Sequence, residues 1–93
     1  MRSMEVLRRK IQLGDCDCTL VYFITIDDIA DAATDLQFES YGVGITICEE
    51  EESVLVRCVT QSSALVFELA RLLHDHIVTP TTVADIVEDW LAS

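Results

Sequence analysis

The sequence predicts an α+β fold, in which a four-stranded antiparallel sheet is followed by two C-terminal helices packed on one of its faces. Two observations lead to this prediction. Up to residue 60, segments rich in β-branched and aromatic residues alternate with turn signals. After residue 60, the apolar residues recur at the three- and four-residue spacing of amphipathic helices. The 93-residue length is that of one domain, which we assign to residues 1–93.

The first two strands are expected at residues 4–13 and 18–26, paired across the turn signal Gly14-Asp15. The second of them, CTLVYFITI, has the composition and the length of a strand. Residues 27–35 (DDIADAATD) are acidic and contain alanine, so a short helical turn or a polar loop is expected there.

A third strand is expected at residues 38–48, because apolar residues alternate there with small or polar ones at period two. Gly42 and Gly44 lie on the face opposite to the apolar residues. Bare glycine on a strand face is typical of a bulge or of a close approach by another backbone. Residues 54–60 (VLVRCVT) form the fourth expected strand, and residues 49–53 form the hairpin loop before it.

The C-terminal third has helical spacing. Ser62 or Ser63 is the expected N-cap of the first helix. Pro80 is expected at the first position of the second helix, where its missing N–H costs nothing. The apolar stripes consist of Leu65, Leu69, Leu72, Leu73, His76 and Ile77 in the first helix, and of Val83, Ile86, Val87, Trp90 and Leu91 in the second.

The charge of the chain limits its partners. Seventeen Asp and Glu residues against six Lys and Arg residues give a formal net charge of −11. Four of the six bases lie in the first ten residues, so the remainder of the chain is more acidic still. Because polyanions are bound through Lys and Arg, direct binding to nucleic acid or to an anionic membrane is not expected. A basic protein or a divalent cation is the partner that this charge favours.

The N-terminal residues contain no apolar stretch followed by a small-residue cleavage site, so no secretory signal is expected. The longest mostly apolar run, residues 20–26, is far shorter than the roughly 20 residues of a membrane-spanning helix. We therefore expect a soluble, cytoplasmic protein. In that compartment the cysteines are expected to be thiols or metal ligands rather than disulfides.

Asp15-Cys16-Asp17-Cys18 is the most unusual local sequence. In a strand, Cys16 and Cys18 project from the same face and would provide half of a tetrahedral zinc site. The other ligands would be drawn from Cys48, Cys58, His74 and His76. The simpler interpretation is that the cysteines are free thiols in the core or at the surface. Since residues two apart on a helix point in different directions, we favour a role for the histidines at the helix end, beside its dipole.

The acidic residues are candidates for partner binding. The aspartates of residues 27–35 lack the spacing of a calcium loop. The glutamates of residues 49–52 are typical of a solvated hairpin tip, or alternatively form a contact patch for a groove lined by Arg and Lys. The candidate partner-binding residues are Asp27, Asp28, Asp31, Asp35, Glu49, Glu50, Glu51, Glu52, Asp85, Glu88 and Asp89. The sequence has no nucleophile elbow and no phosphate-binding loop, so an enzyme is not expected.

Two motifs carry a resemblance to a known family. They are Tyr41-Gly42-Val43-Gly44-Ile45 and the segment VTPTTVADIVEDWL of residues 78–91. With these motifs, residues 20–91 resemble a family of short acidic proteins of unknown function found in Firmicutes and their mobile elements. The resemblance implies a fold and a bacterial source but no catalytic residues, and the Cys16/Cys18 pair is not part of it.

The sequence favours two functions. The first is an acidic inhibitor that occupies the basic DNA-binding surface of a nucleic-acid-handling nuclease and blocks its access to DNA. Small acidic proteins of mobile elements that disable CRISPR effector nucleases are similar to this chain in size and charge. The alternative is a zinc-stabilised structural or regulatory interaction module that forms a homodimer.

Overall fold

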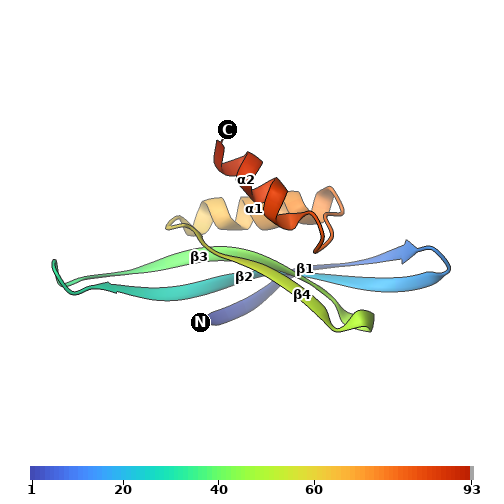
Figure 1. Cartoon of the computed structure of the whole chain (residues 1–93), viewed down its shortest axis with the longest axis horizontal. Coiled ribbons are helices and arrows are strands. Elements are labelled where there is room, and N and C mark those ends of the chain that lie inside the picture. The colour runs from blue at the N-terminus through green and yellow to red at the C-terminus, as the bar shows by residue number, and fades with distance from the viewer. Residues whose placement is uncertain (93) are drawn as a thin grey trace.

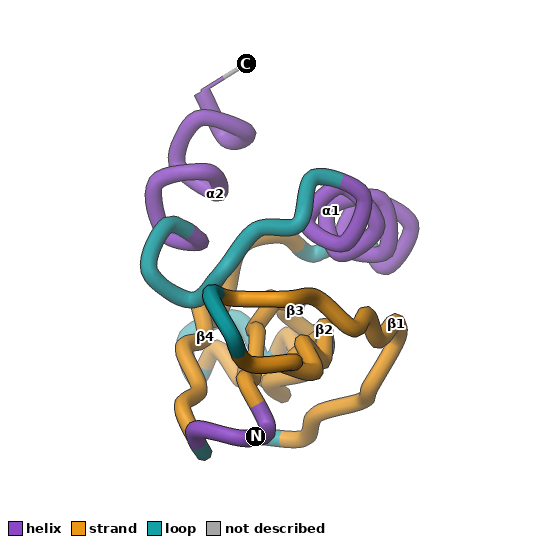
Figure 2. The backbone as a smooth tube through the Cα atoms, turned by 90° about the vertical axis from the view of Figure 1, so that its right-hand side faces the viewer, coloured by secondary structure: helices purple, strands orange, loops and turns teal. Residues whose placement is uncertain are grey.

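The computed structural model describes residues 1–92 and confirms the predicted α+β architecture (Figure 1). The elements are β1 (Arg2–Leu13), β2 (Cys16–Asp31), β3 (Leu36–Ile47), a 3-10 turn η1 (Cys48–Glu50), β4 (Glu52–Thr60), α1 (Ser63–Asp75) and α2 (Val83–Ala92). The strands form one antiparallel sheet in the order β1-β2-β3-β4. Both helices lie on the same side of this sheet, and α2 rises away from it toward its C-terminal end (Figure 2). Neither described helix is long and apolar enough to cross a membrane.

The second and third strands are longer than the sequence predicts. Residues 27–31 continue β2 instead of forming a helical turn or a loop, because they pair in unbroken register with residues 36–40. Within this extension Ile29 lies opposite Phe38, and such cross-strand apolar pairs stabilise a sheet against a weak local propensity. The hairpin therefore projects well beyond the part of the sheet that the helices cover (Figure 1).

The start of the second helix also differs from the prediction. The helix begins at Val83 rather than at Pro80. Before it, the Thr82 N–H donates to the Thr79 carbonyl at 3.2 Å, so the chain closes a turn around the buried Pro80 first. The start of the first helix agrees with the prediction, since the hydroxyl of Ser62 accepts a hydrogen bond from the Leu65 N–H at 3.2 Å.

The core lies between the sheet and the helices, with α1 packed across all four strands and α2 packed on β4. Tyr22 is at its centre and is fully buried. Its hydroxyl donates to the Val78 carbonyl at 3.0 Å, and its ring meets the ring of His74 edge-on at 5.7 Å. Burial raises the pKa of Tyr22, so the hydroxyl keeps the proton that it donates. Besides Tyr22, the fully buried side chains include Leu20, Ile24, Val43, Ile45, Val66, Leu69, Leu73, Val83 and Val87.

On the opposite face of the sheet, other parts of the chain pack directly against the two strand glycines, Gly42 and Gly44. The register of β3 against β4 shifts between Tyr41 and Val43, so β4 bulges opposite Gly42. A Cβ atom at Gly42 would overlap the Val56 carbonyl oxygen and lie 2.7 Å from the Arg57 Cα atom. A Cβ atom at Gly44 would instead overlap the ring of Phe23. Both alternatives raised by the sequence are thus present, a bulge and a close approach.

We predict that Gly42→Ala lowers the free energy of unfolding by about 1–3 kcal/mol, because the added methyl group overlaps backbone atoms of β4, which must shift to accommodate it. Gly44→Ala is the matched control. Its methyl group meets the outer atoms of the half-buried Phe23 ring, and a side chain shifts at a lower cost than backbone, so a smaller loss is expected. Urea denaturation of the two variants measures the difference, and equal losses would contradict the packing described here.

Candidate functional site

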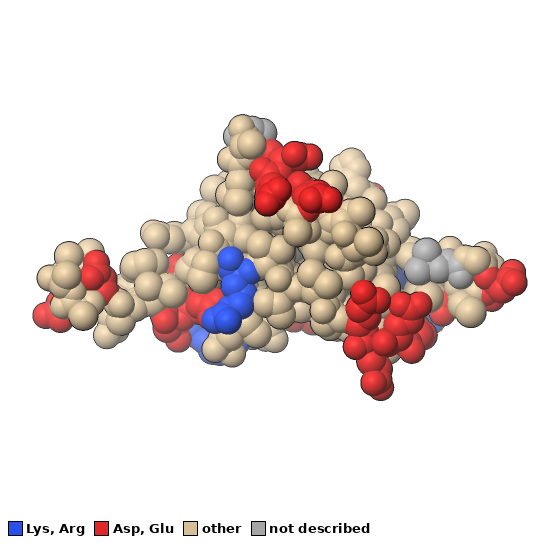
Figure 3. Space-filling model, in the orientation of Figure 1, with Lys and Arg blue, Asp and Glu red and all other residues tan. Residues whose placement is uncertain are grey.

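Apart from Asp27 and Asp28, which lie within β2, the candidate acidic residues lie on three projecting parts of the molecule. One is the tip of the β2–β3 hairpin, the second is the turn between β3 and β4, and the third is the outer face of α2. Figure 3 shows the acidic groups of α2 and of the β3–β4 turn on the same face of the molecule. The candidate residues other than Asp27 are all exposed.

These exposed acids differ in whether they have partners. Both carboxylate oxygens of Glu49 accept from the Thr19 N–H, at 2.7 and 2.8 Å, and Asp31 accepts from the Ala33 N–H at 3.0 Å. The other acids of the β3–β4 turn and those of α2 make no hydrogen bond or ion pair with any residue of the described chain. We call this set the free acidic groups: Glu50, Glu51, Glu52, Asp85, Glu88 and Asp89.

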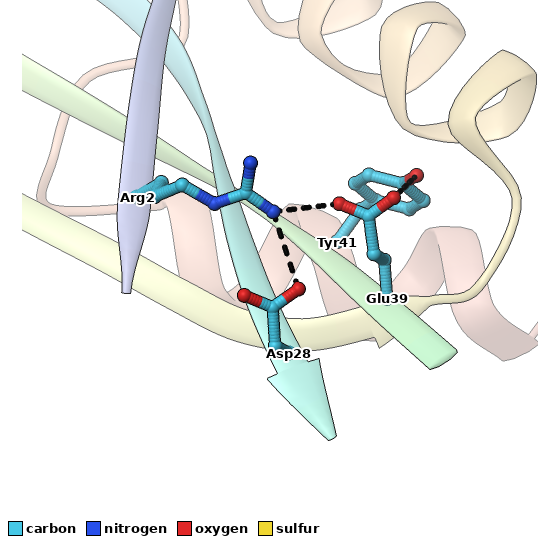
Figure 4. A network of polar contacts seen from close by, with 4 residues as sticks. All are labelled: Arg2, Asp28, Glu39 and Tyr41. Atoms are coloured by element: carbon cyan, nitrogen blue, oxygen red, sulfur yellow. Dashed lines mark hydrogen bonds and ion pairs between the residues drawn. The ribbon is translucent and has the colours of Figure 1, made fainter. Parts of the chain in front are cut away.

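The base of the β2–β3 hairpin is neutralised by the N-terminal arginine (Figure 4). Arg2 Nη2 donates to Asp28 Oδ1 at 3.2 Å and to Glu39 Oε2 at 2.7 Å. The Tyr41 hydroxyl lies 3.5 Å from Glu39 Oε1. The bond with Glu39 and the charge of Asp28 raise the pKa of Arg2. Asp28 is therefore exposed but already paired, which makes it a weaker candidate for partner binding than the free acidic groups.

Asp27 corrects a sequence-based expectation, because it is not a solvent-facing acid. Only 5% of its surface is exposed, on the face of the sheet opposite to the helices. Arg57 Nε donates to its Oδ2 at 3.1 Å, Arg57 Nη2 donates to its Oδ1, and Cys58 Sγ lies 3.9 Å from Oδ2. The hydrogen bonds from Arg57 hold the pKa of Asp27 below its ordinary value. This acid is a structural group that ties β2 to the bulge in β4.

The cysteines are not gathered into the predicted zinc site. All four are free thiols, of which Cys18 is buried and Cys16, Cys48 and Cys58 are exposed. Cys58 lies at the bulge opposite Gly42, whose partner on β2 is Thr25, so it is some 20 Å along the sheet from Cys18. Among residues 1–92 no group of three or more His, Cys, Asp or Glu side chains is placed to hold a metal ion. Burial and the nearby Glu49 raise the pKa of Cys18.

The histidines lie at the end of α1, where the sequence places them. His74 is in the last turn, and its Nδ1 lies 3.0 Å from Asp75 Oδ1. His76 is the C-cap residue, and its N–H donates to the Leu72 carbonyl at 3.0 Å. Arg9 adds a cation at the same helix end, since its Nη1 donates to the His74 carbonyl at 3.2 Å. His74 and Arg9 thus lie at the C-terminal end of α1, where the helix dipole favours positive charge.

The Asp27–Arg57 pair predicts a loss of stability in acid. Because the pKa of Asp27 is lower in the folded than in the unfolded protein, the stabilisation is complete above the ordinary Asp value of 3.8 and is lost as the pH falls through the folded-state pKa. Asp27→Asn should weaken this acid dependence, measured as the urea midpoint against pH. Asp85→Asn, which removes an exposed acid, is the control and should leave the dependence as it is.

Comparison with known proteins assigns the chain to a family along its whole length. Neither a curated protein nor a solved structure matches it. The family model matches residues 1–93, including residues 1–19, which lie outside the resemblance described from the sequence. The chain therefore belongs to DUF6514, a family of unknown function.

Proposed function

We propose that the protein is a small acidic binding protein, without enzymatic activity, that docks on a basic surface of a partner protein and keeps nucleic acid away from that surface. One observation carries the proposal. The free acidic groups stand exposed on two projections of the same face, and no Lys or Arg side chain of residues 1–92 neutralises them (Figure 3). These carboxylates are therefore available to the Lys and Arg side chains of a partner.

The physical basis is competition between the DNA phosphates and the carboxylates of this protein for the same basic surface of the partner. Duplex DNA carries about one negative charge per 1.7 Å, so the proteins that hold it line their channels with Lys and Arg. A rigid sheet with carboxylates at two separated points offers those bases alternative partners. Because the charges are exposed, they also attract the partner over a distance and raise the rate of association.

The structure narrows the set of residues that would make this contact. Asp27, Asp28 and Glu49 are held by partners within the chain. Asp31 accepts a hydrogen bond in the hairpin turn, and Asp35, with φ 56°, shapes the same turn. The free acidic groups remain as the principal contact residues.

The narrower form of the proposal names the target as a CRISPR effector nuclease and the source as a bacterial mobile element. Its support is the size of the chain and its formal charge of −11, which suit a protein that occupies a DNA channel. The general form requires only a basic surface that nucleic acid also uses.

Displacement of a labelled DNA duplex tests the proposal across purified CRISPR effector nucleases and unrelated DNA-binding proteins. For a protein that is inhibited, we expect Glu50→Gln, Glu51→Gln and Glu52→Gln together to raise the inhibition constant roughly ten-fold, since each exposed charge contributes up to about 1 kcal/mol. The inhibition should also weaken as salt screens the charges.

A second variant with the same change in net charge is the control. It carries Asp15→Asn, Asp17→Asn and Glu68→Gln, all at exposed positions outside the free acidic groups. It should inhibit nearly as well as the unaltered protein. An equal loss in both variants would show that only net charge matters, and a failure to displace DNA from every protein tested would contradict the proposed function.

A further inference from the structure

The outer edge of β4 is an unpaired strand edge. Of the described strands, only β3 pairs with β4. From Glu52 to Val56, β4 follows residues 43–47 in unbroken antiparallel register, and the bulge begins after Val56. Alternate N–H and C=O groups of this stretch therefore point away from the sheet, as in any regular edge strand. Such an edge is ready to pair with a further strand.

The other edge of the sheet is protected against pairing, whereas the Glu52–Val56 stretch of β4 is not. The β1 edge strand carries Arg8, Arg9 and Lys10, and its register is broken between Glu5 and Leu7. Charged residues and bulges are the usual means by which an edge strand avoids added strands. In β4 the stretch ESVLV carries one charge, at its first residue.

The surroundings of β4 select the charge of an added strand. The free acidic groups of residues 50–52 lie at its start, and α2, which packs on β4, carries the others on its outer face. Figure 3 shows both sets of acids on one face of the molecule, and Figure 1, in the same orientation, shows β4 running along that face. A second copy of this chain would bring the same acids and a charge of −11, so like-charge repulsion opposes it.

A shallow, open hollow lies beyond the bulge, at the far end of β4. It has a volume of about 380 Å³ and is lined by Val59, Thr60, Leu65, Trp90 and Leu91. Leu65 and Leu91 are 44% and 55% exposed, so the hollow offers apolar surface to a side chain of a bound peptide. A peptide that pairs with the regular part of β4 would reach it after a few more residues, at about 3.3 Å per residue.

We propose that β4 binds an extended basic segment of the partner protein as a fifth strand. Backbone hydrogen bonds to the Glu52–Val56 edge would provide the pairing, and the free acidic groups would receive the lysines or arginines. An apolar side chain near the end of the segment would enter the hollow. This inference rests on the proposed function and adds to it the part of the protein that makes the contact and the conformation of the partner.

The test uses a capped ten-residue peptide of alternating lysine and valine, titrated into isotopically labelled full-length protein. Two further peptides carry N-methyl groups on either the odd or the even residues. Since a strand pairs through alternate residues along one edge, one N-methylated peptide should lose affinity at least ten-fold and the other should bind like the parent. The parent should slow hydrogen exchange of β4 amides and leave the β1 edge amides unchanged.

The controls separate this inference from the proposed function. If both N-methylated peptides bind like the parent, or if the β1 amides are the ones protected, strand addition to β4 is wrong while a charge-driven contact stands. A glutamate–valine peptide that binds as tightly would contradict the basic character of the partner. Two further measurements are made without peptide. If sedimentation shows a dimer and hydrogen exchange of the β4 amides is slow in it, the edge belongs to a second copy and the inference is overturned.

Discussion

The helices cover only one face of the sheet, and the rest of the structure follows from this constraint. Strand side chains alternate between two faces, so β2 and β3 place their apolar residues at alternate positions beneath the helices. Tyr22 is buried there, with its hydroxyl satisfied by the segment that joins the helices. Within residues 1–92, no second layer covers the other face. It is closed by Phe23 over Gly44 and by the β4 bulge over Gly42, which brings Arg57 onto Asp27.

The parts of the fold that are encoded locally could be predicted from the sequence. Period-two alternation locates a strand and a serine before an apolar helical stripe locates an N-cap, as Ser62 shows. The extension of β2 through residues 27–31 could not be predicted in this way, because its stability comes from pairing with residues 36–40. The start of α2 was misplaced for a similar reason, since the turn from Thr79 to Thr82 takes precedence over the helix preference of Pro80.

The candidate site likewise has features that local sequence predicts and features that depend on contacts between distant residues. Exposure of acids at the turns and on the outer face of α2 follows from local pattern and was predicted for residues 49–52. Which acids are neutralised by a base does not follow from local pattern. Arg2 is 37 residues from Glu39 in the sequence and Arg57 is 30 residues from Asp27, so the fold alone brings these pairs together. Local pattern therefore identifies the candidate acids, and only the fold separates those held within the chain from those free for a partner. The open β4 edge is equally a property of the strand order.

The unequal charge of the two sheet edges bears on self-association. Although the net charge of −11 makes whole copies repel each other, a basic β1 edge and an acid-flanked β4 edge would attract each other locally, and such a head-to-tail contact repeats from copy to copy into rings or fibres. The chain opposes this outcome locally. Arg2, Arg8 and Arg9 are engaged by Glu39, Glu5 and the His74 carbonyl, and a break in register interrupts β1. With three of its four bases occupied and its register broken, β1 is a poor partner for β4, which leaves the β4 edge open to a basic strand from a different protein.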